Sequence, residues 1–216
     1  MYGMRSEEFD SLTSGMKALV FSPAAAADDK RVILYLHGAG GFGAGLAGLY
    51  EFSNLPTLLR DGMTLASTVI IPSCHEGEHW QPRTIGAFLD DFERSKGTTG
   101  MKYDVVGYSR GGTGAYSFAA SAPERVRTIV AISARFAPDV IAKIAAIPTL
   151  LVHGTKDTRV TVEESRCMYQ GISEAGGVCE LLLVDGDHFI SAHVLSRNTI
   201  FQWQRSAVAL IRQSMG

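Results

Sequence analysis

The sequence has few cysteines, little net charge and no long apolar run, and each shortage excludes a class of protein. Its 216 residues hold three cysteines and no Cys-x-x-Cys pair, which argues against a disulfide framework or a thiolate metal site. A net charge of −2 provides no electrostatic footprint for nucleic acid or an anionic membrane. No apolar run approaches membrane-spanning length, and the first ten residues lack the basic-then-apolar order of a secretory signal. We therefore expect a soluble, cytoplasmic protein with no cofactor and no nucleic-acid or membrane partner.

What is present favours one globular domain over residues 1–216, with residues 1–16 at its periphery. The composition is 46% hydrophobic and 19% charged, which is enough to fill one core. Apolar runs predict strands at 17–22 (an edge strand), 32–36, 68–71, 102–108, 126–133, 149–153 and 180–184. Helices are predicted at 85–92, 113–122, 140–145, 163–175 and 200–211, together with a helical stretch that ends at 55–59. This alternation predicts an α/β fold, a mostly parallel sheet with helices on both faces.

A serine held between glycines follows the strand at 102–108, in the sequence GYSRGG at residues 107–112. A strand, a sharp turn and a helix of small residues are the context of a nucleophile elbow. In that turn the serine backbone is strained, and glycines two residues before and after it relieve the crowding. The pattern predicts Ser109 as a nucleophile.

An acid and a base follow later strands in the order that such a site requires. A serine hydroxyl becomes nucleophilic when a histidine takes its proton, and an acid fixes the tautomer of that histidine. Asp157 follows the strand at 149–153, and His188 follows the strand at 180–184. Asp139 and His193 are the competing acid and base, but neither has the position directly after a strand that the motif requires. The predicted catalytic residues are Ser109, Asp157 and His188.

Four motifs together resemble the α/β-hydrolase superfamily over residues 31–216: LHGAGG at 36–41, GYSRGG at 107–112, VHGTKD at 152–157 and GDH at 186–188. The resemblance is to a lidless branch of serine esterases, similar to dienelactone hydrolases, carboxylesterases and polyhydroxybutyrate-depolymerase-like esterases. It implies an oxyanion hole made by the backbone N–H of Arg110 and of Ala39 or Gly40. Dienelactone hydrolases use a cysteine nucleophile, so the serine at position 109 favours ordinary ester hydrolysis.

The segment at 134–147, where many lipases insert a lid, has room for only one short helix. We therefore expect an open cleft that accepts small or short-acyl carboxylic esters. The predicted cleft walls are Phe42, His79, Trp80 and Phe189. A peptidase or thioesterase on the same residues, or a catalytically silent binding protein, remains an alternative, and the oligomeric state is left open.

Two further motifs point to other chemistry. HEGEH at 75–79 matches the zinc-protease pattern, with His75 and His79 as ligands, but that pattern needs a helix. Because Pro72 and Pro82 flank it and Gly77 interrupts it, we interpret it as a solvated loop and keep a zinc hydrolase as a remote alternative. GAGGFG at 38–43 matches a dinucleotide-binding pattern, yet no acidic residue ends the next strand. An oxyanion loop explains its glycines better.

Overall fold

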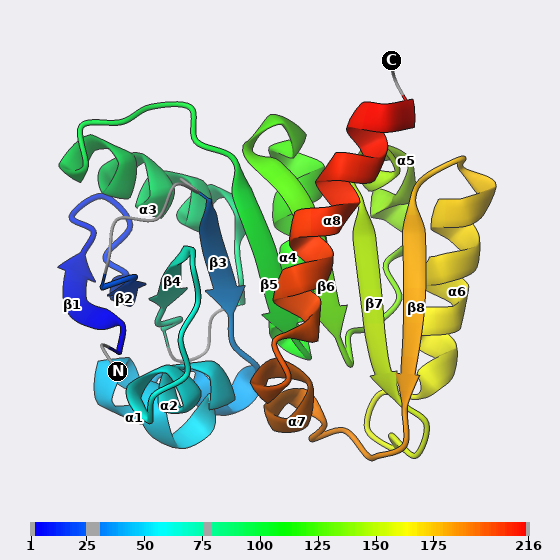
Figure 1. The fold of residues 1–216 in the computed structure, drawn as a ribbon, viewed down its shortest axis with the longest axis horizontal. Helices are drawn as coiled ribbons and strands as arrows, with labels where there is room; N and C mark the ends of the chain where they lie inside the picture. Colours follow the sequence, from blue (N-terminus) through cyan, green and yellow to red (C-terminus); the bar gives the residue numbers. More distant parts are fainter. Residues whose placement is uncertain (1–2, 25–30, 76–78, 215–216) are drawn as a thin grey trace.

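An eight-stranded sheet forms the middle of the molecule, with strand order β1-β2-β4-β3-β5-β6-β7-β8 (Figure 1). The computed structural model describes residues 3–24, 31–75 and 79–214. The strands are β1 (Arg5–Asp10), β2 (Lys17–Ser22), β3 (Val32–Leu36), β4 (Thr68–Pro72), β5 (Tyr103–Tyr108), β6 (Val126–Ile132), β7 (Thr149–Gly154) and β8 (Cys179–Val184). β2 pairs antiparallel with both of its neighbours, and the remaining pairs are parallel. This arrangement confirms the predicted mostly parallel sheet.

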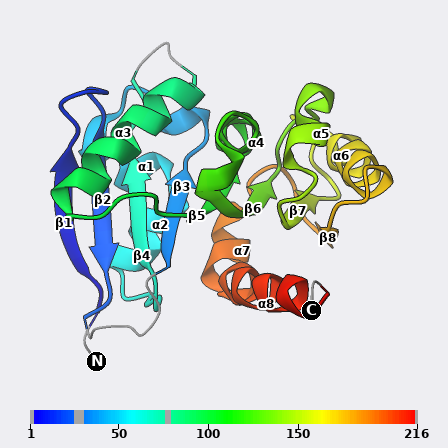
Figure 2. The same cartoon turned by 90° about the horizontal axis from the view of Figure 1, so that it is seen from above.

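Helices cover both faces of the sheet (Figure 2). The α-helices are α1 (Gly45–Phe52), α2 (Asn54–Arg60), α3 (Pro82–Ser95), α4 (Arg110–Ser121), α5 (Ile141–Ile144), α6 (Val162–Glu174), α7 (Ser191–Ser196) and α8 (Thr199–Ser214). Short 3₁₀ turns are η1 (Ala39–Gly41), η2 (Pro123–Arg125) and η3 (Pro138–Val140). Residues of α3, α4, α5 and α6 form one buried apolar cluster, and residues of α1, α2, α7 and α8 form a second. The sheet separates these two cores.

The central strands read as continuous apolar runs because each of their faces meets one of the two cores. All five residues of β3 are buried. Leu34 packs into the cluster under α3 and α4, whereas its neighbours Ile33 and Tyr35 pack into the cluster under α1, α2 and α7. Parallel strands covered on both faces have this composition, so the sequence is sufficient to place them.

Three elements differ from the sequence prediction. β1 was not predicted, and it pairs along the whole of β2, so β2 is an inner strand and not the edge strand. The residues of β1 are almost all exposed, which removes the alternation that would signal a strand. The helical stretch ending at 55–59 is two helices that meet at Ser53, and α7 was missed altogether.

The segment between β6 and β7 contains only η3 and α5. These two short elements pack near α4 and α6, and no lid domain is inserted at this point among the described residues. Among the helices of the same residues, none has both the length and the hydropathy that spanning a bilayer requires.

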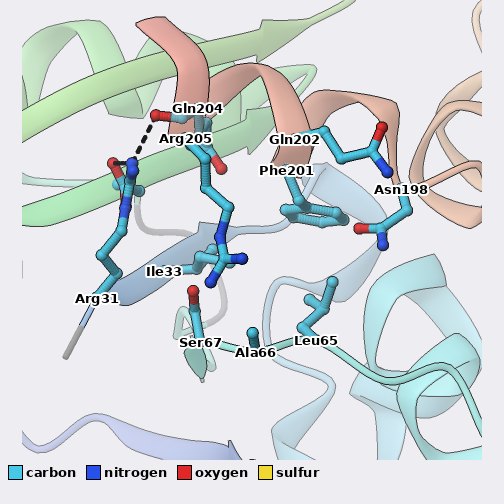
Figure 3. A pocket seen from close by; sticks show the side chains of 11 residues that line it. Arg31, Ile33, Leu65, Ala66, Ser67, Asn198, Phe201, Gln202, Gln204 and Arg205 are labelled. Atoms are coloured by element: carbon cyan, nitrogen blue, oxygen red, sulfur yellow. Dashed lines mark hydrogen bonds and ion pairs between the residues drawn. The ribbon is translucent and has the colours of Figure 1, made fainter. Parts of the chain in front are cut away.

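At the amino ends of the parallel strands, beside the pocket drawn in Figure 3, a buried carboxylate accepts four hydrogen bonds. Asp104, on β5, is 1% exposed and accepts from Arg31 at 2.7 Å through each carboxylate oxygen. Arg127 donates at 3.1 Å and the Thr128 hydroxyl at 2.8 Å. Arg31 also donates to the carbonyl of Gln204 on α8, beside a pocket of about 170 Å³. The cluster therefore joins β3, β5, β6 and α8 at the edge of the sheet opposite Ser109.

Candidate active site

Ser109 occupies the sharp turn between β5 and α4. Its φ of 52° and ψ of −116° lie in a region that L-residues rarely adopt, so the backbone is strained as the motif predicts. The Ser109 N–H donates to the carbonyl of Ile132 on β6 at 2.8 Å. Its carbonyl accepts from Gly112 at 2.9 Å and from Thr113 at 3.2 Å, which starts α4. The turn is thus fixed by the neighbouring strand and by the helix that follows.

Glycines are required on both sides of Ser109 because the backbone approaches itself closely. A Cβ on Gly107 would overlap the carbonyl of Gly111, and a Cβ on Gly111 would overlap the carbonyl of Leu36 at the end of β3. These are backbone contacts, so no side-chain movement could relieve them. The two glycines let α4 begin directly against the sheet and leave the Ser109 side chain at the carboxyl edge.

The structure brings Ser109, His188 and Asp157 into one hydrogen-bonded chain. His188 Nε2 lies 3.0 Å from Ser109 Oγ, and His188 Nδ1 lies 2.7 Å from Asp157 Oδ2. Asp157 follows β7 and is 6% exposed; His188 follows β8 and is 7% exposed. The competing residues are elsewhere: Asp139 is exposed in η3, and His193 is exposed on α7. Nδ1–H donating to the carboxylate leaves Nε2 free to accept the Ser109 proton.

The local backbone holds Asp157 ionised. Burial raises its pKa, but hydrogen bonds from the Val160 N–H, from His188 and from the Arg159 N–H outweigh burial and leave the pKa below its ordinary value. Both backbone N–H groups donate to Oδ1 at 2.9 Å, so Oδ2 is the oxygen left for His188. His153 Nε2 also lies 3.3 Å from Oδ2. The carboxylate therefore presents one defined oxygen to the imidazole.

Two contacts that the sequence did not reveal support the loop that carries His188. The hydroxyl of Tyr108 donates to the His188 carbonyl at 3.1 Å, and the two rings lie 5.5 Å apart. A Cβ on Gly154, the last residue of β7, would overlap the carbonyl of Asp187. Tyr108 occupies the variable position of the G-x-S-x-G pattern, so the motif gave no signal for it.

The predicted oxyanion donors lie on η1 and at the start of α4. Among the described residues, the backbone N–H groups of Ala39, Gly40 and Arg110 have no backbone acceptor, as expected for first residues of helical turns. The amino terminus of α4 adds the positive end of the helix dipole beside Ser109. These N–H groups are available for a negatively charged oxygen.

A buried histidine ties η1 to the end of β4. His37 is fully buried, and its burial lowers its pKa to about 4, so the ring is neutral near pH 7. Its Nδ1–H donates to the Gly38 carbonyl at 2.8 Å, and Nε2 accepts from the Cys74 N–H at 3.3 Å. The Trp80 indole N–H donates to the His37 carbonyl at 2.9 Å.

Trp80, a predicted cleft residue, is buried in the structure. It is 5% exposed and packs edge-on against His37 at 4.8 Å, with Gly114 of α4 against its indole. Its large apolar ring fills the space between α4 and η1, and the indole N–H finds a backbone acceptor there. Trp80 therefore supports the segment between β3 and η1.

The other predicted cleft residues lie closer to the surface. Phe42 is partly buried, with the Arg110 guanidinium 5.9 Å from its ring centre. Phe189 is 59% exposed and lies edge-on to His188 at 5.7 Å. His79 is exposed. The sequence missed Phe52, which is 54% exposed at the end of α1 beside Gly40.

The HEGEH motif is only partly described. His75 and His79 are exposed and lie outside any helix, whereas Glu76, Gly77 and Glu78 lie outside the described residues. The helix that a zinc-protease motif needs is therefore not seen at either histidine. Elsewhere in the described ranges, no group of three His, Cys, Asp or Glu side chains is placed to hold a metal ion.

This fold, with a strained serine after β5 and an acid and a base after β7 and β8, is the α/β-hydrolase fold. Residues 87–199, just over half of the chain, match the family model described as "Serine hydrolase (FSH1)". The chain belongs to this serine hydrolase family. No curated protein sequence matches it.

Solved structures with the same fold include several hydrolases. A thermostable esterase has a TM-score of 0.66 at 18% identity, over 94% of this chain and 62% of its own. A structure described as a "predicted CIB-like hydrolase" from Thermoplasma acidophilum has a TM-score of 0.64 at 19% identity, over 94% of this chain and 100% of its own. Esterase PE8 has a TM-score of 0.61 at 21% identity, over 98% of this chain and 99% of its own. At these identities the likeness establishes the fold.

Proposed function

We propose that this serine hydrolase cleaves small or short-acyl carboxylic esters through an acyl-enzyme. The observation that carries the proposal is the placement of His188, which has Nε2 at 3.0 Å from Ser109 Oγ and Nδ1 at 2.7 Å from Asp157 Oδ2. Both distances allow proton transfer and orientation without rearrangement.

In the proposed mechanism, Ser109 Oγ attacks the ester carbonyl carbon while its proton passes to His188 Nε2. The carbonyl oxygen becomes negatively charged and accepts hydrogen bonds from the N–H of Arg110 and of Ala39 or Gly40. Imidazolium formation is stabilised by Asp157. The C–O bond to the alcohol then breaks, and the alcohol oxygen takes the proton from Nε2. Water then attacks the acyl carbon while His188 Nε2 takes its proton. The bond from that carbon to Ser109 Oγ breaks, the acid is released, and the proton on Nε2 returns to Oγ.

The expected preference for small esters rests on the short segment between β6 and β7. The 134–147 segment adds only η3 and α5, and Phe52 and Phe189 are exposed apolar groups near the oxyanion loop and the base. Short acyl chains can be bound by such a surface, whereas a long chain would leave most of its apolar area in water.

A fluorophosphonate probe and an ester panel test the proposal. We expect the probe to label the protein and Ser109→Ala to abolish labelling, with Ser121→Ala as the matched control because Ser121 is an exposed serine at the far end of the same helix, α4. Short-chain nitrophenyl esters should be cleaved faster than long-chain esters. No labelling would indicate a silent binding protein, and faster cleavage of thioesters or peptides would replace the ester assignment.

A further inference from the structure

Arg159 presents a cationic group beside the base of the active site. Its backbone N–H donates to Asp157 Oδ1 at 2.9 Å, which fixes the start of the side chain. Its exposed guanidinium lies 4.9 Å from the centre of the Phe189 ring. Phe189 in turn lies 5.7 Å from the His188 ring, and its N–H donates to Asp187 Oδ1 at 2.8 Å. Imidazole, phenyl ring and guanidinium therefore form a continuous row.

The Arg159 charge is not neutralised by a carboxylate in the described part of the chain. The ion pairs found there leave it without a partner within 4.0 Å. The acids two residues before Arg159 and two residues before Phe189 have other roles: Asp157 is bound to His188, and Asp187 accepts from the Phe189 N–H. The field of Arg159 reaches Tyr108, where burial raises the pKa to about 12 and Arg159 opposes the rise. A cation held on an aromatic ring beside the site is a preorganised anion-binding group.

The position of this group relative to His188 indicates which half of the substrate it meets. His188 Nε2 gives its proton to the oxygen of the departing alcohol, so that oxygen must come within hydrogen-bond distance of the imidazole. The rest of the alcohol then extends across the residues that adjoin the imidazole. Phe189 and Arg159 are such residues.

We propose that Arg159, stacked on Phe189, binds a negatively charged group on the leaving alcohol, so that the favoured substrates are esters of alcohols or phenols bearing a carboxylate or another anion. Phe189 supplies an exposed apolar face for the carbon skeleton of the alcohol. The Arg159 guanidinium donates charge-assisted hydrogen bonds to the anion at the far end of that alcohol. This substrate class rests on the proposed ester hydrolysis at Ser109.

The test compares 4-acetoxybenzoate with its neutral analogue 4-acetoxybenzamide, and the measured quantity is the ratio of their kcat/KM values. Arg159→Gln should lower this ratio about two- to fivefold, the upper part of the range for an exposed ion pair. Arg159→Lys should retain part of the preference because it keeps the charge. Arg166→Gln is the matched control, an exposed arginine on α6 paired with Glu163 at 3.2 Å, and should leave the ratio unchanged.

Three outcomes separate the possible failures. A ratio within twofold of the unaltered protein in Arg159→Gln would overturn the proposal while leaving ester hydrolysis intact. Phenyl hydrogen succinate and phenyl succinamate form a second pair, in which the charge lies on the acyl side. If Arg159→Gln lowered the kcat/KM ratio of this pair more than that of the acetoxy pair, the placement of Arg159 on the alcohol side would be overturned. If Ser109→Ala still cleaved both acetoxy esters, the proposed function itself would fail. In support, rising salt should lower the ratio in the unaltered protein and leave it flat in Arg159→Gln.

Discussion

The two carboxylate oxygens of Asp157 have different hydrogen-bond partners. Replacing one of these oxygens by an NH₂ group is therefore expected to change the site. Oδ1 is held by the N–H groups of Arg159 and Val160, and Oδ2 faces His188 Nδ1. An asparagine at this position would keep its oxygen on the two backbone donors. Its NH₂ group would then take the place of Oδ2 and would force the proton of His188 onto Nε2.

We expect Asp157→Asn to lower kcat about 10³- to 10⁴-fold on a short-chain ester, because an Nε2–H imidazole cannot accept the Ser109 proton. The fold should persist, since both backbone hydrogen bonds to the side-chain oxygen remain. Asp139→Asn is the control, as Asp139 is exposed in η3. Steady-state kinetics would contradict the assignment if Asp139→Asn cost more activity than Asp157→Asn.

At the scale of elements, η1 depends on a histidine that must stay neutral. His37 uses Nδ1–H and Nε2 to join Gly38 to Cys74, and burial lowers its pKa from 6.5 to about 4. Between pH 6.5 and 4, His37 is protonated in the unfolded chain but stays neutral in the folded chain. The stabilisation is therefore complete above pH 6.5 and is lost as the pH falls toward 4.

Thermal unfolding between pH 7 and pH 4 tests this dependence. His37 should contribute a slope of up to about 1.4 kcal/mol per pH unit within the window from 6.5 to 4. His37→Gln should be less stable at pH 7 and should show a shallower loss on acidification. His193→Gln, exposed on α7, should keep the slope of the unaltered protein. Equal slopes in His37→Gln and the unaltered protein would refute the assignment.

How far the sequence predicts these elements depends on where their side chains lie. β3 and β5 to β7 are buried on both faces, so continuous apolar runs identify them. β1 is exposed and is held by pairing with β2, a non-local contact that leaves no pattern in its own residues. α7 has six residues, too few for a helical period to be read.

The candidate site follows the same rule. Ser109, Asp157 and His188 could be predicted because each lies in the loop or turn that follows a strand, and parallel strands bring their carboxyl ends to one edge. Trp80 also follows a strand, but the distance from strand to helix does not say whether an indole turns to solvent or to the core. The close approach of α4 to the end of β3 at Gly111 and the contact of Gly114 with the indole decide it.

At the scale of the whole molecule, stability and chemistry are placed at opposite edges of the sheet. Asp104 joins three strands and α8 at the amino edge through Arg127, which is 24% exposed, and Arg31, which is 13% exposed. Arg31 also reaches the Gln204 carbonyl on α8 (Figure 3). If the carboxylate charge is removed, the guanidinium groups of Arg31 and Arg127 stay partly buried but lose the negative charge that compensates them. Breaking a buried pair in this way is costly because the remaining charge is uncompensated.

We expect Asp104→Asn to lower the free energy of unfolding by about 3–5 kcal/mol, measured by chemical denaturation. Asp61→Asn, which removes an exposed carboxylate paired with Arg60 at 2.9 Å, should leave the denaturation midpoint unchanged. Below the transition, Asp104→Asn should still react with a fluorophosphonate at Ser109, because β5 separates the two residues and the turn is fixed by Ile132 and α4. An unchanged midpoint would mean that the strands and α8 are joined by apolar packing alone.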